Sequence, residues 1–219
     1  MKSKVKELYK DDFILFEKLN NSIEGFQNLN KLIDGVLYIN LAHRTDRKKH
    51  IEKELDKISS ICNTIERIDA IKHNNGAKGC GMSHIKALEY AKQNKWSNVL
   101  IVEDDLIFKN ITLIETITDP LDKLTNEFDV LIFSGNILKQ NNININHLAK
   151  PINVQTTSCY LINSHYFDTL INVFKESVEK LKYTNNYSNS HKWAIDRHWF
   201  KLQEKDNWYI FKPTIAYQM

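Results

Sequence analysis

Residues 98–105 have the sequence NVLIVEDD, an apolar run of strand-forming residues that ends in three consecutive acids. The run predicts a buried β-strand, because Val, Ile and Leu side chains pack well on a covered sheet. Charged groups are rarely buried without a partner, so Glu103, Asp104 and Asp105 mark the point where the chain leaves the core. Open α/β sheets bind ligands outside the carboxyl ends of their strands. The stretch therefore predicts a central strand with a candidate site at its end.

The segments on either side alternate between the two kinds of secondary structure. Apolar runs predict five further strands, at 36–41, 63–70, 128–135, 156–163 and 208–218. Pro213 interrupts the last of these strands. Apolar residues at helical spacing predict helices over 46–58, 80–94 and 164–182. This alternation is typical of a layered α/β domain, which we place at residues 36–219.

Two kinds of segment lie outside these elements. Residues 1–35 carry an amphipathic pattern and are predicted to form a helical extension. Such an extension packs on the domain or mediates self-association, so a homo-oligomer is one expectation. The polar stretches 140–146 and 183–190 are predicted to be loops near a site.

Composition excludes several classes of protein. The 30 basic and 27 acidic residues give a formal net charge of +3, and the many lysines are scattered, which argues against a nucleic-acid partner. Three cysteines without a Cys-x-x-Cys pair argue against a disulfide framework and against a cysteine-rich zinc site. No apolar run approaches the roughly 20 residues of a membrane span, and the first residues are charged where a secretory signal is apolar. We therefore expect a cytoplasmic protein without a transmembrane segment.

The three acids have a metal-binding interpretation and a simpler one. If the chain stays extended, Glu103 and Asp105 share one face of the strand and Asp104 takes the other. Two carboxylates on one face repel each other unless a cation lies between them, and an oxygen-rich site suits Mg²⁺ or Mn²⁺. The alternative is that the acids merely end the strand and face solvent. The placement after a buried run favours a metal at Glu103 and Asp105.

The loop after the first predicted strand holds two of the four arginines. In NLAHRTDR, residues 40–47, Arg44 and Arg47 flank Asp46 at the start of a helix. Arginine binds phosphate or carboxylate through two parallel hydrogen bonds, and helix N-termini favour anions, so the loop could bind a nucleotide. A pairing of Arg44 or Arg47 with Asp46 that stiffens the turn explains the pattern equally well.

Residues 76–84, GAKGCGMSH, place three of the six glycines just before a predicted helix. Glycine permits close approach of a ligand to the backbone, but the segment lacks the Lys-Ser/Thr pair of a phosphate loop. Ser83 is a candidate cap and His84 a candidate core histidine. Without a Gly-x-Ser-x-Gly elbow there is no case for a Ser-His-Asp triad, and nothing nearby lowers the pKa of Cys80 enough to favour a nucleophile.

Taken in order, VLYINLAHRTDR, IERIDA, GCGMSHIKALEYA and VLIVEDDLIF resemble the family 25 glycosyltransferases, which include lipooligosaccharide and procollagen galactosyltransferases. The resemblance covers residues 36–108 and continues more loosely through TTSCYLIN, IDRHWF and WYIFKPTIAYQ. It implies a GT-A type, Rossmann-like fold with a mixed, mostly parallel sheet. It also implies a UDP-sugar donor and a divalent metal, Mn²⁺ or Mg²⁺, at Glu103 and Asp105. The donor pocket implied by the resemblance contains Asn40, Leu41, Arg44, Arg47, Gly79, Ser83, His84 and Asp104.

The same resemblance implies the reaction. The expected activity is the transfer of galactose or glucose from a UDP-sugar to a hydroxyl of a glycan or protein, with inversion at the anomeric carbon. Inversion needs a general base, for which Asp196 is the first candidate and His198 the second; a helix N-cap is the structural explanation for Asp196. Because the chain is short for this family, the alternative is a catalytically silent carbohydrate-binding or scaffold module. A weaker alternative is a metal-dependent phosphohydrolase that uses the same acids.

Overall fold

The computed structural model describes residues 33–62, 64–109, 116, 120, 123, 124, 127–181 and 191–219. These residues build a six-stranded sheet with the order β2-β1-β3-β6-β5-β7. The strands are β1 (Gly35–Asn40), β2 (Ile65–Asp69), β3 (Asn98–Glu103), β5 (Val130–Asn142), β6 (Leu148–Asn163) and β7 (Trp208–Phe211). Of the six, β6 runs antiparallel to its neighbours, whereas β1, β2 and β3 are parallel to one another and β5 is parallel to β7. The predicted α/β class with a mixed, mostly parallel sheet is confirmed.

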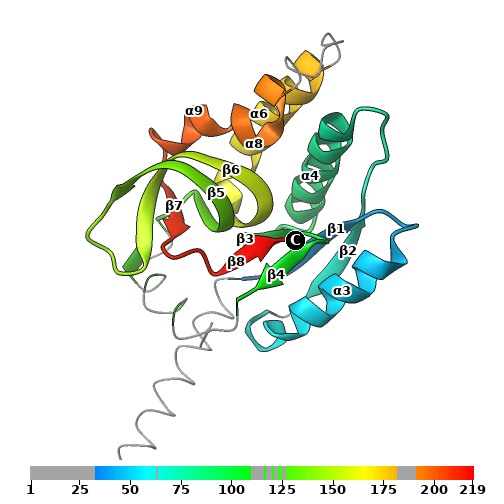
Figure 1. Ribbon diagram of the computed structural model, residues 1–219, viewed down its shortest axis with the longest axis horizontal. Helices are drawn as coiled ribbons and strands as arrows, with labels where there is room; N and C mark the ends of the chain where they lie inside the picture. The colour runs from blue at the N-terminus through cyan, green and yellow to red at the C-terminus, as the bar shows by residue number, and fades with distance from the viewer. Residues whose placement is uncertain are drawn as a thin grey trace, which may run out of the picture.

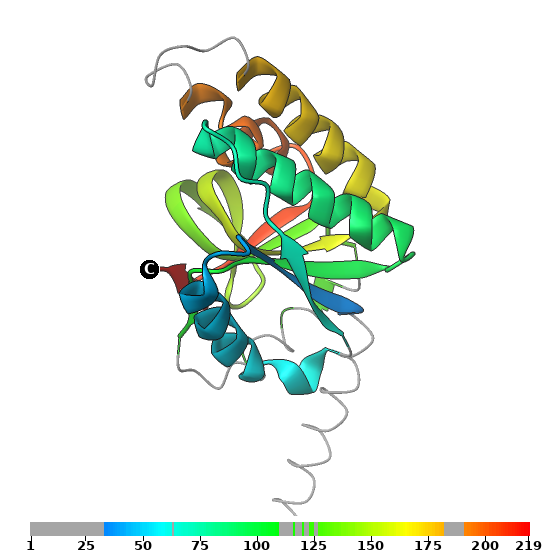
Figure 2. The same ribbon diagram turned by 90° about the vertical axis from the view of Figure 1, so that its right-hand side faces the viewer.

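Helices cover both faces of this sheet. Helix α3 (Thr45–Asp56) lies on one face, and α4 (Gly76–Gln93) and α6 (Phe167–Lys180) lie side by side on the other (Figures 1 and 2). Successive side chains of a strand point to opposite faces, so the apolar runs supply both layers of the core. On β3, Leu100 and Val102 pack on the α3 side, and Val99 and Ile101 pack on the α4 and α6 side.

Short elements complete the described part of the fold. The 3₁₀ turns are Ser59–Ile61, Ser164–Tyr166 and His191–Trp193, and the short helices are α8 (Ile195–His198) and α9 (Phe200–Gln203). Strands β4 (Leu106–Phe108) and β8 (Ala216–Gln218) pair antiparallel in a small second sheet. The backbone N–H of Met219 donates to the carbonyl of Asp105 at 2.9 Å. The pairing therefore brings β8 to the carboxyl end of β3.

Four details of the prediction are wrong. Strand β3 ends at Glu103, and Asp104 and Asp105 form a turn, so the acids do not alternate across an extended strand. Helix α4 begins at Gly76, so its glycines lie within the helix and not before it. The stretch 208–218 forms two strands in different sheets, and residues 140–142 belong to β5.

Other expectations lie outside the described residues. The helical extension over 1–35 lies outside them except for Ile33, Asp34 and Gly35, and Gly35 is already the first residue of β1. The predicted loop 183–190 also lies outside. Within the described residues, no helix is both long and apolar enough to cross a membrane.

Candidate functional site

A cleft lies where the parallel strands β1, β2 and β3 end. In the sheet register Asn40 is opposite Asp69, and Ile39 is opposite Glu103, so polar residues that end three strands share one edge. The cleft has a volume of about 240 Å³ and lies between this edge, the loop after β1 and the first turns of α4. Its lining residues are Ile39, Leu41, Arg44, Arg47, Ala70, Ile71, Lys72, His73, Gly76, Gly79, Cys80, Ser83, His84, Glu103 and Asp104. This is the edge at which open α/β sheets bind ligands.

The loop after β1 is tied to the acids that follow β3. The side-chain amide of Asn40, which is 1% exposed, donates to Asp104 Oδ2 at 2.7 Å and to the carbonyl of Arg44 at 3.1 Å. Arg47 Nη1 donates to Asp104 Oδ1 and to Asp105 Oδ2, both at 3.0 Å. Two segments distant in sequence are therefore fixed to each other by charged and polar contacts.

The two arginines of this loop have different partners, and only Arg44 forms the pair with Asp46 that the simpler interpretation of the motif predicts. Arg44 donates through Nε and Nη2 to Asp46 at 3.0 and 2.8 Å, which is the pairing that stiffens the turn. This pairing holds the pKa of the Asp46 carboxyl well below its usual range. Arg47 instead pairs with the acids after β3, and both arginines line the cleft.

Glu103 uses its two carboxylate oxygens on different neighbours. Oε1 contacts His84 Nε2 at 3.2 Å and accepts from Thr157 Oγ1 at 2.7 Å, whereas Oε2 accepts from Gln218 Nε2 at 3.2 Å. Burial by itself raises the pKa of Glu103, but the contacts with His84 and Thr157 and the charge of Arg47 outweigh it, and the pKa is lowered. Glu103 is therefore an ionised carboxylate at neutral pH.

Asp105 lies beside Glu103 without as many donors. Gln218 Nε2 also donates to Asp105 Oδ1, at 3.1 Å, so one amide group bridges Glu103 and Asp105. Burial and the negative charge of Glu103 raise the pKa of Asp105, against the opposing effects of Gln218 and Arg47. The carboxylate of Asp105 is thus destabilised by its surroundings, and a cation beside it would relieve that penalty.

The start of α4 is held against the loop 70–75. Asn75 caps the helix by accepting from the backbone N–H of Lys78 at 3.1 Å. A Cβ atom on Gly79 would lie 2.6 Å from the carbonyl oxygen of Ile71, so only glycine fits this contact. Ser83 Oγ donates to the carbonyl of Gly79 at 2.7 Å and accepts from the N–H of Ile71 at 2.8 Å. Gly79 and Ser83 therefore shape the wall of the cleft.

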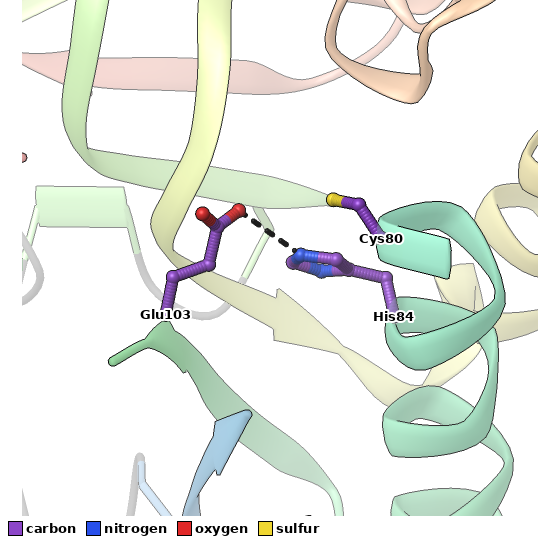
Figure 3. Close-up of side chains that lie close together, drawn as sticks. All are labelled: Cys80, His84 and Glu103. Carbon is purple, nitrogen blue, oxygen red and sulfur yellow. Dashed lines mark hydrogen bonds and ion pairs between the residues drawn. The ribbon is translucent and has the colours of Figure 1, made fainter. Parts of the chain in front are cut away.

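Cys80 and His84 lie one turn apart on α4 and face Glu103 (Figure 3). His84 is 1% exposed, and its Nδ1 is 3.0 Å from the hydroxyl of Tyr160. Burial raises the pKa of the Cys80 thiol well above its usual value, and the charges of Glu103 and Asp196 add to this effect. The thiol is neutral at physiological pH, which agrees with the expectation that Cys80 is no nucleophile.

The two candidate bases occupy different surroundings. Asp196 lies in the first turn of α8, where Ala194 and not Asp196 is the N-cap residue, and its Oδ2 accepts from the N–H of Thr156 at 3.2 Å. Burial raises the pKa of Asp196, and the charge of nearby Glu103 contributes. His198 Nε2 lies 2.9 Å from Glu176 Oε2 and 3.0 Å from Lys201 Nζ. Neither Asp196 nor His198 is among the residues that line the cleft.

The structure therefore gathers most of the predicted residues. Seven of the eight predicted donor residues line the cleft; the eighth, Asn40, is hydrogen-bonded to Asp104 behind it. Sequence reasoning missed Thr157 and Gln218, which contact Glu103 but carry no local motif. It also missed the grouping of Cys80 with His84, for which the four-residue spacing on a helix is a usable signal.

These features define an α/β protein with an acidic, arginine-lined cleft at the carboxyl ends of parallel strands. Comparison with known families gives the closer assignment, since glycosyltransferase family 25 (LPS biosynthesis protein) matches residues 72–196, more than half of the chain. The chain belongs to this family, which supports a glycosyltransferase. No curated protein matches the sequence significantly.

Solved structures give distant similarities. A glycosyltransferase involved in glycosylation of the major capsid of PBCV-1 has a TM-score of 0.49 and 8% identity, over 85% of this chain and 92% of that one. Mannose-1-phosphate geranyltransferase from Thermus thermophilus has a TM-score of 0.47 and 9% identity, over 82% and 73%. The glycosyltransferase GlyE in Streptococcus pneumoniae TIGR4 has a TM-score of 0.45 and 11% identity, over 82% and 45%. At these TM-scores none of them bears on activity.

Proposed function

We propose that this glycosyltransferase transfers a hexose, galactose or glucose, from a UDP-sugar to a hydroxyl of a glycan or protein, with a divalent cation and with inversion at the anomeric carbon. The observation that carries the proposal is the convergence of Glu103, Asp105 and Arg47 beside the cleft. Family membership supports the class of reaction, and this cluster of charges supports a diphosphate donor.

The donor half of the site is built by the loop after β1. Arg44 and Arg47 line the cleft near the N-terminus of α3, whose backbone N–H groups favour an anion. A diphosphate there would accept hydrogen bonds from guanidinium groups, which suit phosphate oxygens. We expect Arg47 to hold Asp104 and Asp105 in position at the same time.

The carboxylate oxygens that follow β3 are suitable ligands for a hard divalent cation. Carboxylate oxygens of Glu103 and Asp105 already converge on a single amide group of Gln218, and the raised pKa of Asp105 indicates a surplus of negative charge. Oxygen ligands of this kind suit Mn²⁺ or Mg²⁺. When bound, such an ion would neutralise the charge that develops on the diphosphate leaving group.

Asp196 is the proposed general base. In an inverting transfer the acceptor oxygen forms a bond to the anomeric carbon while the bond to the diphosphate breaks, and the acceptor proton must be removed. The Asp196 carboxylate lies near Glu103, and the adjacent residues Thr156 and Thr157 hold Asp196 and Glu103 respectively. Its proton would pass to solvent after the product leaves.

The test is a panel of nucleotide sugars with the full chain. Thermal unfolding with and without Mn²⁺ should show that UDP-galactose or UDP-glucose raises the melting temperature only when the ion is present, because a ligand that binds the native state stabilises it. Transfer is then measured as UDP release with glycan and peptide acceptors. Asp105→Asn should reduce UDP release by about 100-fold or more, since such a change removes charge stabilisation in the transition state.

Asp168→Asn serves as a matched control, because Asp168 is an exposed carboxylate that pairs with Lys92 outside the cleft lining. It should retain most of the activity. Failure of every UDP-sugar to bind would contradict the proposal. Binding without turnover on all acceptors would favour the catalytically silent module, and release of phosphate from simple phosphate esters would favour the phosphohydrolase.

A further inference from the structure

We propose that Cys80, His84 and Glu103 form a binding site for a thiophilic divalent cation, with Zn²⁺ as the preferred ion. This site is separate from the oxygen-only position between Glu103 and Asp105. It does not depend on which sugar donor the protein uses. It is also distinct from a cysteine-rich zinc site, because it combines one sulfur, one nitrogen and one oxygen ligand.

The ligand atoms of the three side chains lie close enough together to bind one ion. The Sγ of Cys80, a ring nitrogen of His84 and a carboxylate oxygen of Glu103 all lie within 4.8 Å of one another. Cys80 and His84 are four residues apart on α4, so they share one face of the helix, and Glu103 comes from the end of β3 (Figure 3). Among the described residues, these three form the one group of His, Cys, Asp and Glu side chains that is close enough to hold an ion with three ligands.

A contact at Nδ1 orients the imidazole of His84 so that Nε2 is available to a metal ion. The Tyr160 hydroxyl lies 3.0 Å from Nδ1, which leaves Nε2 directed at Glu103 Oε1, 3.2 Å away. The ring also stacks on Tyr160 at a centroid distance of 5.8 Å and meets the edge of Phe174 at 6.1 Å. Histidine ligands of metals are usually fixed by a hydrogen bond on the second ring nitrogen. Tyr160 supplies this contact through a side chain with no exposed surface.

Glu103 can serve this site and the neighbouring one because its oxygens diverge. Oε1 faces His84 and Thr157, whereas Oε2 faces Gln218. A cation at Cys80 and His84 would replace the direct contact between His84 and Oε1 and would leave Oε2 beside Asp105. One carboxylate thus separates a sulfur- and nitrogen-containing site from an oxygen-only site.

The donor atoms determine which ion binds. Cys80 releases its thiol proton to solvent when the ion binds. Thiolate and imidazole ligands favour Zn²⁺ over Mg²⁺ and Mn²⁺, which prefer oxygen. Three protein ligands leave a fourth tetrahedral position, as in zinc sites that bind water or substrate. All three residues line the cleft, so the ion can enter from it and the fourth ligand would come from there.

Cobalt substitution tests the proposal without any enzyme assay. The chelator-treated full chain is titrated with Co²⁺, and absorption is followed for the sulfur-to-cobalt charge-transfer band and the visible bands of tetrahedral cobalt. We expect both in the wild type, loss of the charge-transfer band in Cys80→Ala, and displacement of Co²⁺ by an equivalent of Zn²⁺ but not by excess Mn²⁺. Tyr160→Phe should keep the band and weaken binding by about 10-fold.

Two variants act as controls. Cys62→Ala removes a buried cysteine of the other core layer and should leave the band unchanged. Asp105→Asn should also leave it unchanged, which separates this site from the Mn²⁺ position of the proposed function. The wild type without a charge-transfer band, or a band that survives in Cys80→Ala, would overturn the proposal. If Cys80→Ala fails to fold by circular dichroism, Cys80→Ser and His84→Gln carry the same test through loss of the tetrahedral visible bands.

Discussion

At the scale of single residues, Thr156 and Asp196 form the unusual pair of the site. Thr156 is a β-branched residue with a φ of 81°, which costs about 1–3 kcal/mol for a side chain of this kind. The strand pairing between β5 and β6 is irregular at this point, and the N–H of Thr156 donates to Asp196. A strained backbone conformation of this kind persists only where the surrounding structure holds it in place. The conformation of Thr156 in β6 therefore fixes the N–H group that binds Asp196.

Replacing Asp196 tests the proposed base. Asp196→Asn should lower kcat by about 100- to 10,000-fold with little change in KM for the donor, because a general base contributes that much to the rate. The base acts when ionised, so wild-type activity rises as the pH rises through a pKa above the ordinary value of 3.8. A pH–rate profile of both proteins measures this. His198→Gln is the control: if it, and not Asp196→Asn, removes the acidic limb, the assignment is wrong.

The same substitution should stabilise the protein. Because the folded-state pKa of Asp196 is raised, its ionised form costs stability above that pKa, and this cost disappears below the unfolded-state value. Asn pays no such penalty and can still accept from Thr156. Asp196→Asn should therefore unfold at a higher temperature than the wild type at neutral pH, with the difference shrinking toward pH 3.8 and below. A lower melting temperature at neutral pH would contradict the burial argument.

At the scale of elements, the contact of α4 with the loop 70–75 positions one wall of the cleft. The helix approaches this loop because Gly79 has no side chain, and Ser83 bonds the backbone of both segments. Gly81 allows a second close approach, since a Cβ there would lie 2.8 Å from Val178 of α6. Two glycines within one helix thus set its distance from two neighbours.

Gly79→Ala tests this packing. The added methyl must displace the Ile71 carbonyl, so we expect a loss of about 1–3 kcal/mol in the free energy of unfolding, with weaker donor binding. Gly76→Ala is the matched control: no atom lies within 4 Å of its Cβ position, and alanine favours a helix by up to about 1 kcal/mol. Chemical denaturation of both variants gives the comparison. Equal stability of the two variants would show that the loop 70–75 can move away from the added methyl group without a loss of stability.

The sequence predicts the presence and type of the main helices and strands better than the residues at which they begin and end. Strand β1, strand β3 and helix α6 follow from apolar periodicity, because each buries a full face against its neighbours. The periodicity did not show that β3 stops at Glu103, since the turn at Asp104 depends on hydrogen bonds from Asn40 and Arg47, more than 50 residues away. The sequence places the start of α4 too late, because glycine by itself disfavours helices and here packing outweighs that preference.

At the scale of the whole molecule, the last strand completes the acidic site. Pairing of β8 with β4 places Gln218 against Glu103 and Asp105, which precede it by 115 and 113 positions. No local pattern in the sequence could indicate this contact, because it arises only when the second sheet forms. The candidate site thus combines segments from β1, α4, β3, β6, α8 and β8, of which β1, α4, β3 and α8 carry residues that the sequence motifs predict.

Gln218→Glu tests whether this point is a cation site. Without metal, a third carboxylate beside Glu103 and Asp105 should reduce stability by on the order of 1 kcal/mol, which is the repulsion of close charges in a partly hydrated environment. With Mn²⁺ the same charge becomes an additional ligand, so the ion should raise the melting temperature of the variant more than that of the wild type. Gln218→Met removes the amide without adding charge and should lack this enhanced response. Thermal unfolding in chelator and in rising Mn²⁺ separates the three proteins, and an equal response of all three would place the ion elsewhere.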